Sequence, residues 1–226
     1  MNAERQIWVN RLRSVAMATL GKQPLLPQPG TFIDEQRKRL AVDEGLFASL
    51  RSDTRWGVGA TQAREGEVRL WCGAPVDAVV LPCDATYAAG GRGLLGDWND
   101  QPADTPQVAT AVWTDRELCA LHALWTRARS ADPADRARWA RRGHQACRWL
   151  LANKRDSVEV ALPWSAHVWV LVSESEPREW GSGLGTEARV YAENLLHGCL
   201  KGRERPGGGR RAAWILWHAA RELESW

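Results

Sequence analysis

Residues 114–151 read TDRELCALHALWTRARSADPADRARWARRGHQACRWLL, and this stretch decides the fold of the chain. Thr114 and Glu117 have the spacing of a capping box, which predicts the start of a helix. Asp132 in front of Pro133 predicts the start of the next helix, because aspartate caps helices and proline suits the first helical position. The stretch therefore predicts two antiparallel helices joined by a short loop.

Apolar residues at helical spacing continue on both sides of this hairpin. The spacing predicts a helix over residues 3–20, with Ile7 and Leu12 on its apolar side. Residues 163–173 have an ambiguous composition, and we favour a helix there. The remaining helices are predicted over residues 34–52, 186–200 and 210–224. Short connections between helices are typical of a bundle, so we expect an antiparallel helical bundle or array from about residue 110 to 226.

The pattern changes near residues 66–82. Residues 67–72 alternate polar and apolar side chains, residues 77–81 form a short β-branched run, and turn residues lie between them. This combination predicts a small β-hairpin. The sequence thus predicts a mainly α protein in two parts. Residues 1–105 form a mixed helical and β region, and residues 106–226 form a tryptophan-rich helical bundle.

The composition bounds the class of protein. The chain has 14 Trp against 2 Tyr and 2 Phe, and tryptophan is enriched among residues that anchor protein interfaces. Its five cysteines lack the spacing of a disulfide framework. The sequence has neither an apolar run of about 18 residues nor a signal-peptide pattern. We therefore expect a cytoplasmic protein without a membrane partner.

Two mirror-image pairs, Cys119 with His122 and His144 with Cys147, carry the clearest chemical pattern. Residues three apart share a helix face, and the predicted hairpin places both pairs at a similar height. Two cysteines and two histidines suit tetrahedral zinc, which is the one cofactor that the sequence suggests. The alternative is that all four side chains are ordinary core residues, because cysteine is often buried.

Basic residues are concentrated in the second half of the chain, although the net charge is only +3. Trp139 and Trp149 lie among several arginines of the second hairpin helix, and aromatic and basic side chains together are typical of single-strand nucleic-acid binding. These arginines are Arg136, Arg138, Arg141, Arg142 and Arg148. Within the glycine-rich segment 202–211 the candidate anion contacts are Arg205, Arg210 and Arg211. The alternative is that the helix-bound arginines form an ordinary helix face in contact with water.

No set of residues forms a recognisable catalytic constellation, so no catalytic residue is predicted. The sequence favours a non-enzymatic helical scaffold or protein-interaction module whose partner is another protein. One alternative is a nucleic-acid-associated protein that uses the basic C-terminal half. Another is an α-helical, hydrolase-like enzyme with a Trp-lined pocket, for which the candidate residues are Asp97, Asp100, His167 and Glu193.

Overall fold

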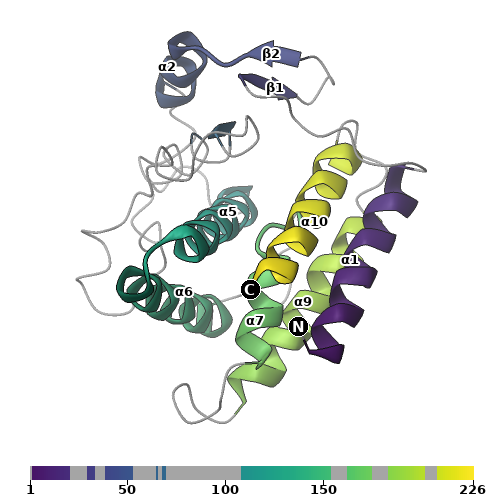
Figure 1. The fold of residues 1–226 in the computed structure, drawn as a ribbon. Coiled ribbons are helices and arrows are strands. Elements are labelled where there is room, and N and C mark those ends of the chain that lie inside the picture. The colour runs from purple at the N-terminus through teal and green to yellow at the C-terminus, as the bar shows by residue number, and fades with distance from the viewer. Residues whose placement is uncertain are drawn as a thin grey trace. The chain divides into compact units, whose positions relative to one another are not determined.

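A computed structural model describes residues 2–20, 30–33, 39–52, 65, 68–69, 108–153, 162–174, 183–201 and 208–226 (Figure 1). These residues are mainly helical, as predicted. The helices are α1 Ala3–Leu20, α2 Glu44–Ser52, α5 Val108–Ser130, α6 Pro133–Asn153, α7 Ala166–Glu174, α9 Leu184–Lys201 and α10 Gly208–Ser225. The strands are β1 Thr31–Ile33 and β2 Arg39–Ala41.

The chain divides into two compact units, and the N-terminal helix belongs with the C-terminal ones. Unit 1 contains residues 1–26 and 159–226, and unit 2 contains residues 27–158. This division differs from the predicted boundary near residue 105. The physical reason is that α1 packs along α10 and α9, so contacts between distant parts of the sequence define unit 1.

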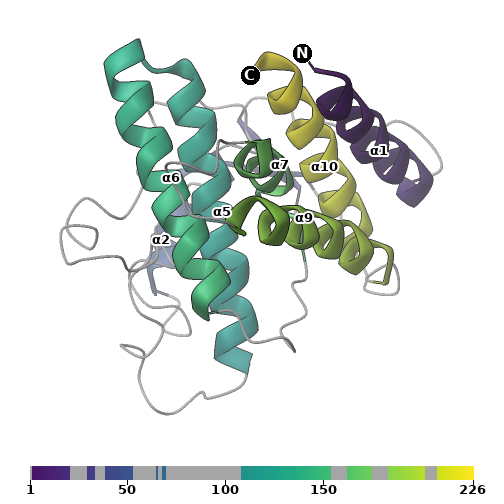
Figure 2. The same cartoon turned by 90° about the horizontal axis from the view of Figure 1, so that it is seen from below.

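Helix α1 buries one face in unit 1, where it lies beside α10 (Figure 1, Figure 2). Trp8, Val9, Leu12 and Ala16 are at most 3% exposed. Their spacing of three to four residues forms a single apolar stripe. The prediction of a helix over residues 3–20 is confirmed, but Ile7 is 58% exposed and lies outside this stripe.

Helix α7 is the most buried element of unit 1, and it packs against α9. All residues from Ala166 to Val172 are buried, which explains why the segment has no polar face to distinguish helix from strand in the sequence. The ring of Trp169 lies 4.4 Å from that of Tyr191 on α9, measured between centroids. The two helices also approach closely at Gly185, where an added Cβ would lie 3.2 Å from the Ser173 carbonyl oxygen.

Helices α5 and α6 form the predicted hairpin in unit 2, and they lie side by side (Figure 2). Asp132 caps α6 as expected, because its Oδ1 accepts hydrogen bonds from the backbone N–H groups of Ala134 and Asp135, each at 3.0 Å. The capping box at Thr114 is wrong. Helix α5 begins six residues earlier, at Val108, so Thr114 lies within its second turn.

A glycine allows the two hairpin helices to approach each other closely. A Cβ added to Gly143 on α6 would lie 2.4 Å from Nε1 of Trp125 on α5. Trp125 is only 4% exposed, and its ring meets that of His144 edge to face at 5.5 Å. The indole therefore occupies the space that a side chain at position 143 would need.

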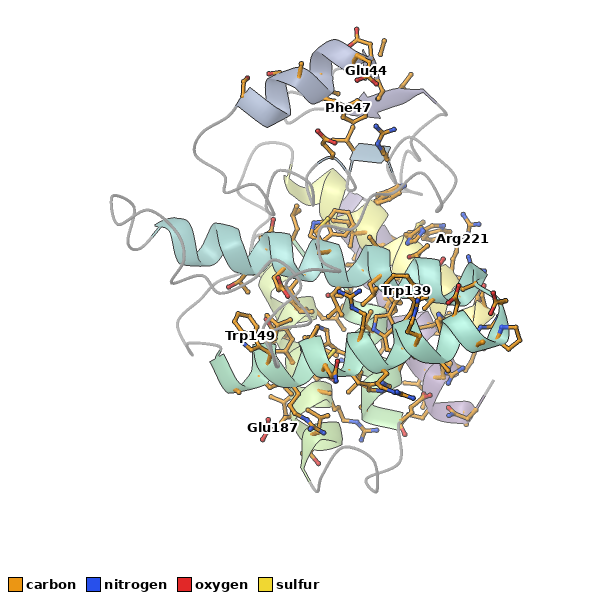
Figure 3. All side chains as sticks on the ribbon, turned by 90° about the vertical axis from the view of Figure 1, so that its left-hand side faces the viewer. Glu44, Phe47, Trp139, Trp149, Glu187 and Arg221 are labelled. Atoms are coloured by element: carbon orange, nitrogen blue, oxygen red, sulfur yellow. The ribbon has the colours of Figure 1, made fainter. Side chains whose placement is uncertain are left out.

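The β structure lies in a different place from the one predicted. Strands β1 and β2 pair antiparallel, with Phe32 opposite Leu40. The predicted helix over residues 34–52 is therefore confirmed only for α2, since β2 precedes it. The hairpin predicted near 66–82 lies largely outside the described residues, but Val68 and Arg69 are helical rather than extended. The Arg69 guanidinium packs 4.2 Å from the ring centroid of Phe47, which Figure 3 labels on α2.

Candidate functional site

The four predicted zinc ligands all lie on the α5–α6 hairpin and are buried. Cys119, His122 and Cys147 have no exposed surface, and His144 is 8% exposed. Among the described residues, however, no group of three or more His, Cys, Asp or Glu side chains is placed to hold a metal ion. The predicted ligand set is therefore not assembled in this part of the chain.

The contacts of His144 and Cys147, the two predicted ligands on α6, are those of side chains in a helical core. Nδ1 of His144 lies 3.0 Å from the carbonyl oxygen of Ala140 in its own helix, and the imidazole packs against Trp125. Burial is the main cause that raises the pKa of the Cys147 thiol well above 9.0, and the nearby charge of Glu117 raises it further. Both effects keep Cys147 a protonated thiol at neutral pH, and a thiol is a poor nucleophile. The pair behaves as part of the helical core.

Cys147 is therefore expected to react slowly with iodoacetamide in the folded protein at pH 8, because the thiolate is the nucleophile. Peptide mass spectrometry after pulsed alkylation measures this. Replacing Glu117 with glutamine should leave Cys147 protected, since burial is the larger cause of its raised pKa. The same cysteine in urea-unfolded protein is the positive control, and equal labelling rates in the folded and unfolded chains would contradict the assignment.

The arginines of α6 are largely engaged in structural contacts. Nη2 of Arg136 donates to the carbonyl oxygen of Arg129 at 3.1 Å, which satisfies the C-terminal end of α5. Arg138 forms an ion pair with Asp135 at 3.2 Å. The guanidinium groups of Arg138 and Arg142 also lie 4.8 and 5.4 Å from the ring centroid of Trp139.

Aromatic residues on this helix contribute little to an exposed stacking surface. Trp139, labelled on α6 in Figure 3, is 4% exposed, and Trp149 is half-buried. Of the predicted anion contacts, Arg205 lies outside the described residues. Arg210 and Arg211 lie in the first turn of α10, where the structure describes their backbone but not their side chains.

The residues of the enzyme alternative are not brought together among those described. Asp97 and Asp100 lie outside the described residues. His167 is fully buried in α7, whereas Glu193 lies at the surface of α9 and binds Arg11. A buried aromatic row lies elsewhere in unit 1, where Trp214 of α10 meets Trp164 edge to face at 6.3 Å.

A set of ion pairs attaches α1 to α7, α9 and α10, the other helices described in unit 1. Arg5 binds Glu174 of α7 at 2.5 Å. Arg13 binds Glu224 of α10 at 2.7 Å. These pairs join residues 169 and 211 positions apart in the sequence. Sequence reasoning missed them because a charged residue on a helix edge gives no indication of its partner.

Two further ion pairs join α1 to α9, and we call them the α1–α9 ladder. One is Glu4 with Arg189. The other is bidentate: the two terminal nitrogens of Arg11 donate to the two carboxylate oxygens of Glu193, each at 2.5 Å. The bidentate pair has the parallel geometry that makes arginine–carboxylate contacts directional. All four side chains keep about a third to a half of their surface exposed.

Two exposed apolar side chains lie on the same two helices as the ladder. Ile7 lies between Glu4 and Arg11 in the sequence of α1 and is 58% exposed. Val190 follows Arg189 in the sequence of α9 and is 49% exposed. We call Ile7, Val190 and the four ladder side chains the ladder face. Exposed apolar side chains beside polar and charged ones are a combination found at protein interfaces.

The charges of the ladder shift the pKa of Glu193. The hydrogen bond from Arg11 is the main cause that lowers this pKa below 4.5, and the charges of Arg11, His197 and Arg189 lower it further. Desolvation opposes the shift. Because the folded-state pKa is lower than the unfolded one, the stabilisation is complete above the unfolded value and is lost as the pH falls through the folded value.

Replacing Glu193 with glutamine should therefore destabilise the protein at pH 7, and the penalty should shrink as the pH is lowered to 3. The expected loss at pH 7 is about 0.5–1 kcal/mol, since solvent screens a partly exposed pair. Urea unfolding followed by circular dichroism at both pH values measures it. Glu187→Gln on the same helix is the matched control, and its effect should not follow the same pH dependence. A Glu193→Gln penalty that persists unchanged at pH 3 would contradict the assignment.

Comparison of the chain with protein-family models, curated proteins and solved structures found no match. Among the described residues, no helix is both long enough and apolar enough to cross a membrane. The physical chemistry of the site therefore carries the functional argument.

Proposed function

We propose that the protein is a non-enzymatic helical interaction module that binds another protein through the ladder face of unit 1. The single observation that carries the proposal is the position of Ile7 and Val190. Ile7 is 58% exposed on α1 and Val190 is 49% exposed on α9, the two helices that the ladder joins. Burying this pair of side chains against a partner would remove apolar surface from water at a stabilisation of roughly 25 cal/mol per Å².

The contacts of the basic helix make nucleic-acid binding the less supported alternative. Binding to phosphates requires guanidinium groups that are available to replace counterions. Arg136 is bonded to the end of α5, and Arg138 is shared between Asp135 and Trp139. The ladder side chains are likewise paired within unit 1, but Ile7 lies outside the buried stripe of α1 and keeps its apolar surface exposed.

Site-specific photocrosslinking tests the proposal. A photoreactive phenylalanine analogue at Ile7 should give defined protein adducts in cells that express the full chain. The same analogue at Ala137, an exposed position on α6, should not. Adding Val190→Glu should abolish the Ile7 adducts, because one partner is proposed to cover both side chains. Adducts that are equally abundant at both positions, or that persist with Val190→Glu, would refute the proposal.

A further inference from the structure

The charges around the two exposed apolar residues alternate in sign on each helix. Glu4 and Arg11 lie seven residues apart on α1, about two turns or 10 Å, with Ile7 between them. On α9, Arg189 and Glu193 lie one turn apart, and Val190 sits between them. Each helix therefore carries one negative and one positive charge on either side of an apolar residue, and the order of the charges is reversed from α1 to α9.

We propose that the partner of the ladder face is a second copy of this chain, which builds on the function proposed above. A two-fold axis that passes near Ile7 and runs perpendicular to α1 would place Ile7 against Ile7 of the other copy, with the two α1 helices antiparallel. Because Glu4 and Arg11 are nearly equidistant from Ile7, the same axis would bring Glu4 of each copy toward Arg11 of the other. A symmetric dimer requires such a self-complementary patch.

The same charge pattern distinguishes a second copy from other partners. The ladder contains two acidic and two basic groups, so its net charge is zero. A polyanion such as nucleic acid binds where positive charge is in excess. A strongly acidic or strongly basic peptide would meet as many like charges as opposite ones. An identical face rotated by two-fold symmetry is the partner that meets opposite charges throughout.

The size of the face predicts a weak dimer. Helices α1 and α9 each have 18 residues and so are roughly 27 Å long. With neighbouring helices about 10 Å apart, two of them present a face of roughly 500–600 Å² to a partner. This is near the low end for specific interfaces, at which association is transient. Dimerisation should therefore depend on protein concentration, by mass action.

Sedimentation equilibrium of the purified full chain tests the proposal over micromolar to several hundred micromolar concentrations. The expected weight-average mass rises from the 25.2 kDa of one chain toward twice that value. Ile7→Glu should hold the mass at one chain, because it places a buried charge at the two-fold axis. Ala137→Glu, which adds the same charge at an exposed position of α6, should associate like the parent protein.

Each other outcome has a defined meaning. A parent chain that stays monomeric over the whole range overturns the second-copy proposal, as does an Ile7→Glu variant that still dimerises. Circular dichroism spectra that superpose for the parent and variant chains exclude unfolding as the cause of any difference. If the purified chain is monomeric while the Ile7 photocrosslinks to other proteins persist in cells, the interaction module stands and only the identity of its partner is wrong.

Discussion

Leu12→Ala should lower the free energy of unfolding of unit 1 by about 2–5 kcal/mol. Leu12 has no exposed surface and lies at the centre of the α1 stripe, which packs along α10. Truncating its isobutyl side chain to a methyl group leaves a cavity between α1 and α10. The loss is comparable with the whole stability of a small unit, since folded domains are stable by only about 5–15 kcal/mol.

Met17→Ala is the matched control for this prediction. Met17 is a large apolar residue on the same helix, but it is 37% exposed, so its truncation should cost well under 1 kcal/mol. Amide hydrogen exchange in α1 and α10 reports the stability of this contact directly. Similar loss of protection in the two variants would show that the buried stripe of α1 does not hold unit 1 together.

Gly143→Val should destabilise the α5–α6 hairpin by about 1–3 kcal/mol or more. Its Cβ alone would lie 2.4 Å from Nε1 of Trp125, and valine adds two methyl groups at that point. The indole is itself held by burial and by the ring of His144, so it has little room to move. Valine is also a stiff residue in helices, which adds to the cost.

A double-mutant cycle isolates the contact between the two residues. In a Trp125→Leu background the smaller side chain leaves space at position 143, so the penalty of Gly143→Val should fall by at least 1 kcal/mol. Urea unfolding of the four proteins gives the coupling free energy. Ala137→Val, at an exposed position of the same helix, separates the intrinsic helix preference of valine from the clash. If the penalties of Gly143→Val and Trp125→Leu are strictly additive, the destabilisation does not come from contact between these two residues.

The local signals in the sequence were informative, and their success has a local cause. Asp132 and Pro133 predicted the start of α6 correctly, because a cap acts on the two or three residues that follow it. The same kind of signal failed at Thr114. Helical residues on its N-terminal side extend α5, and a capping box predicts a start only where the preceding residue leaves the helix.

The candidate interaction surface was beyond sequence reasoning for a different reason. Ile7 fits the apolar spacing of α1 almost as well as Leu12 does, and only the neighbouring helices decide which of the two is covered. The ladder joins residues about 180 positions apart, and nothing near Arg11 identifies Glu193 as its partner. The zinc prediction rested on the spacing of residues along the two hairpin helices. That spacing determines how far along the helix axis a side chain lies, but it does not determine which side chains pack against it.

The pairing of α1 with α9 and α10 has a consequence for synthesis on the ribosome. Helix α1 is translated well before its partners, which end at Lys201 and Ser225, roughly 200 residues later. Translation proceeds at about 5–20 residues per second, so the helices that cover the apolar stripe of α1 are completed about 10–40 s after it. This stripe includes Trp8, Val9 and Leu12. During that interval unit 2 is translated in full and can fold as an insertion within an unfinished unit. The nascent chain therefore carries α1 as an uncovered apolar helix until α9 and α10 have been made, which makes α1 a binding site for a ribosome-associated chaperone.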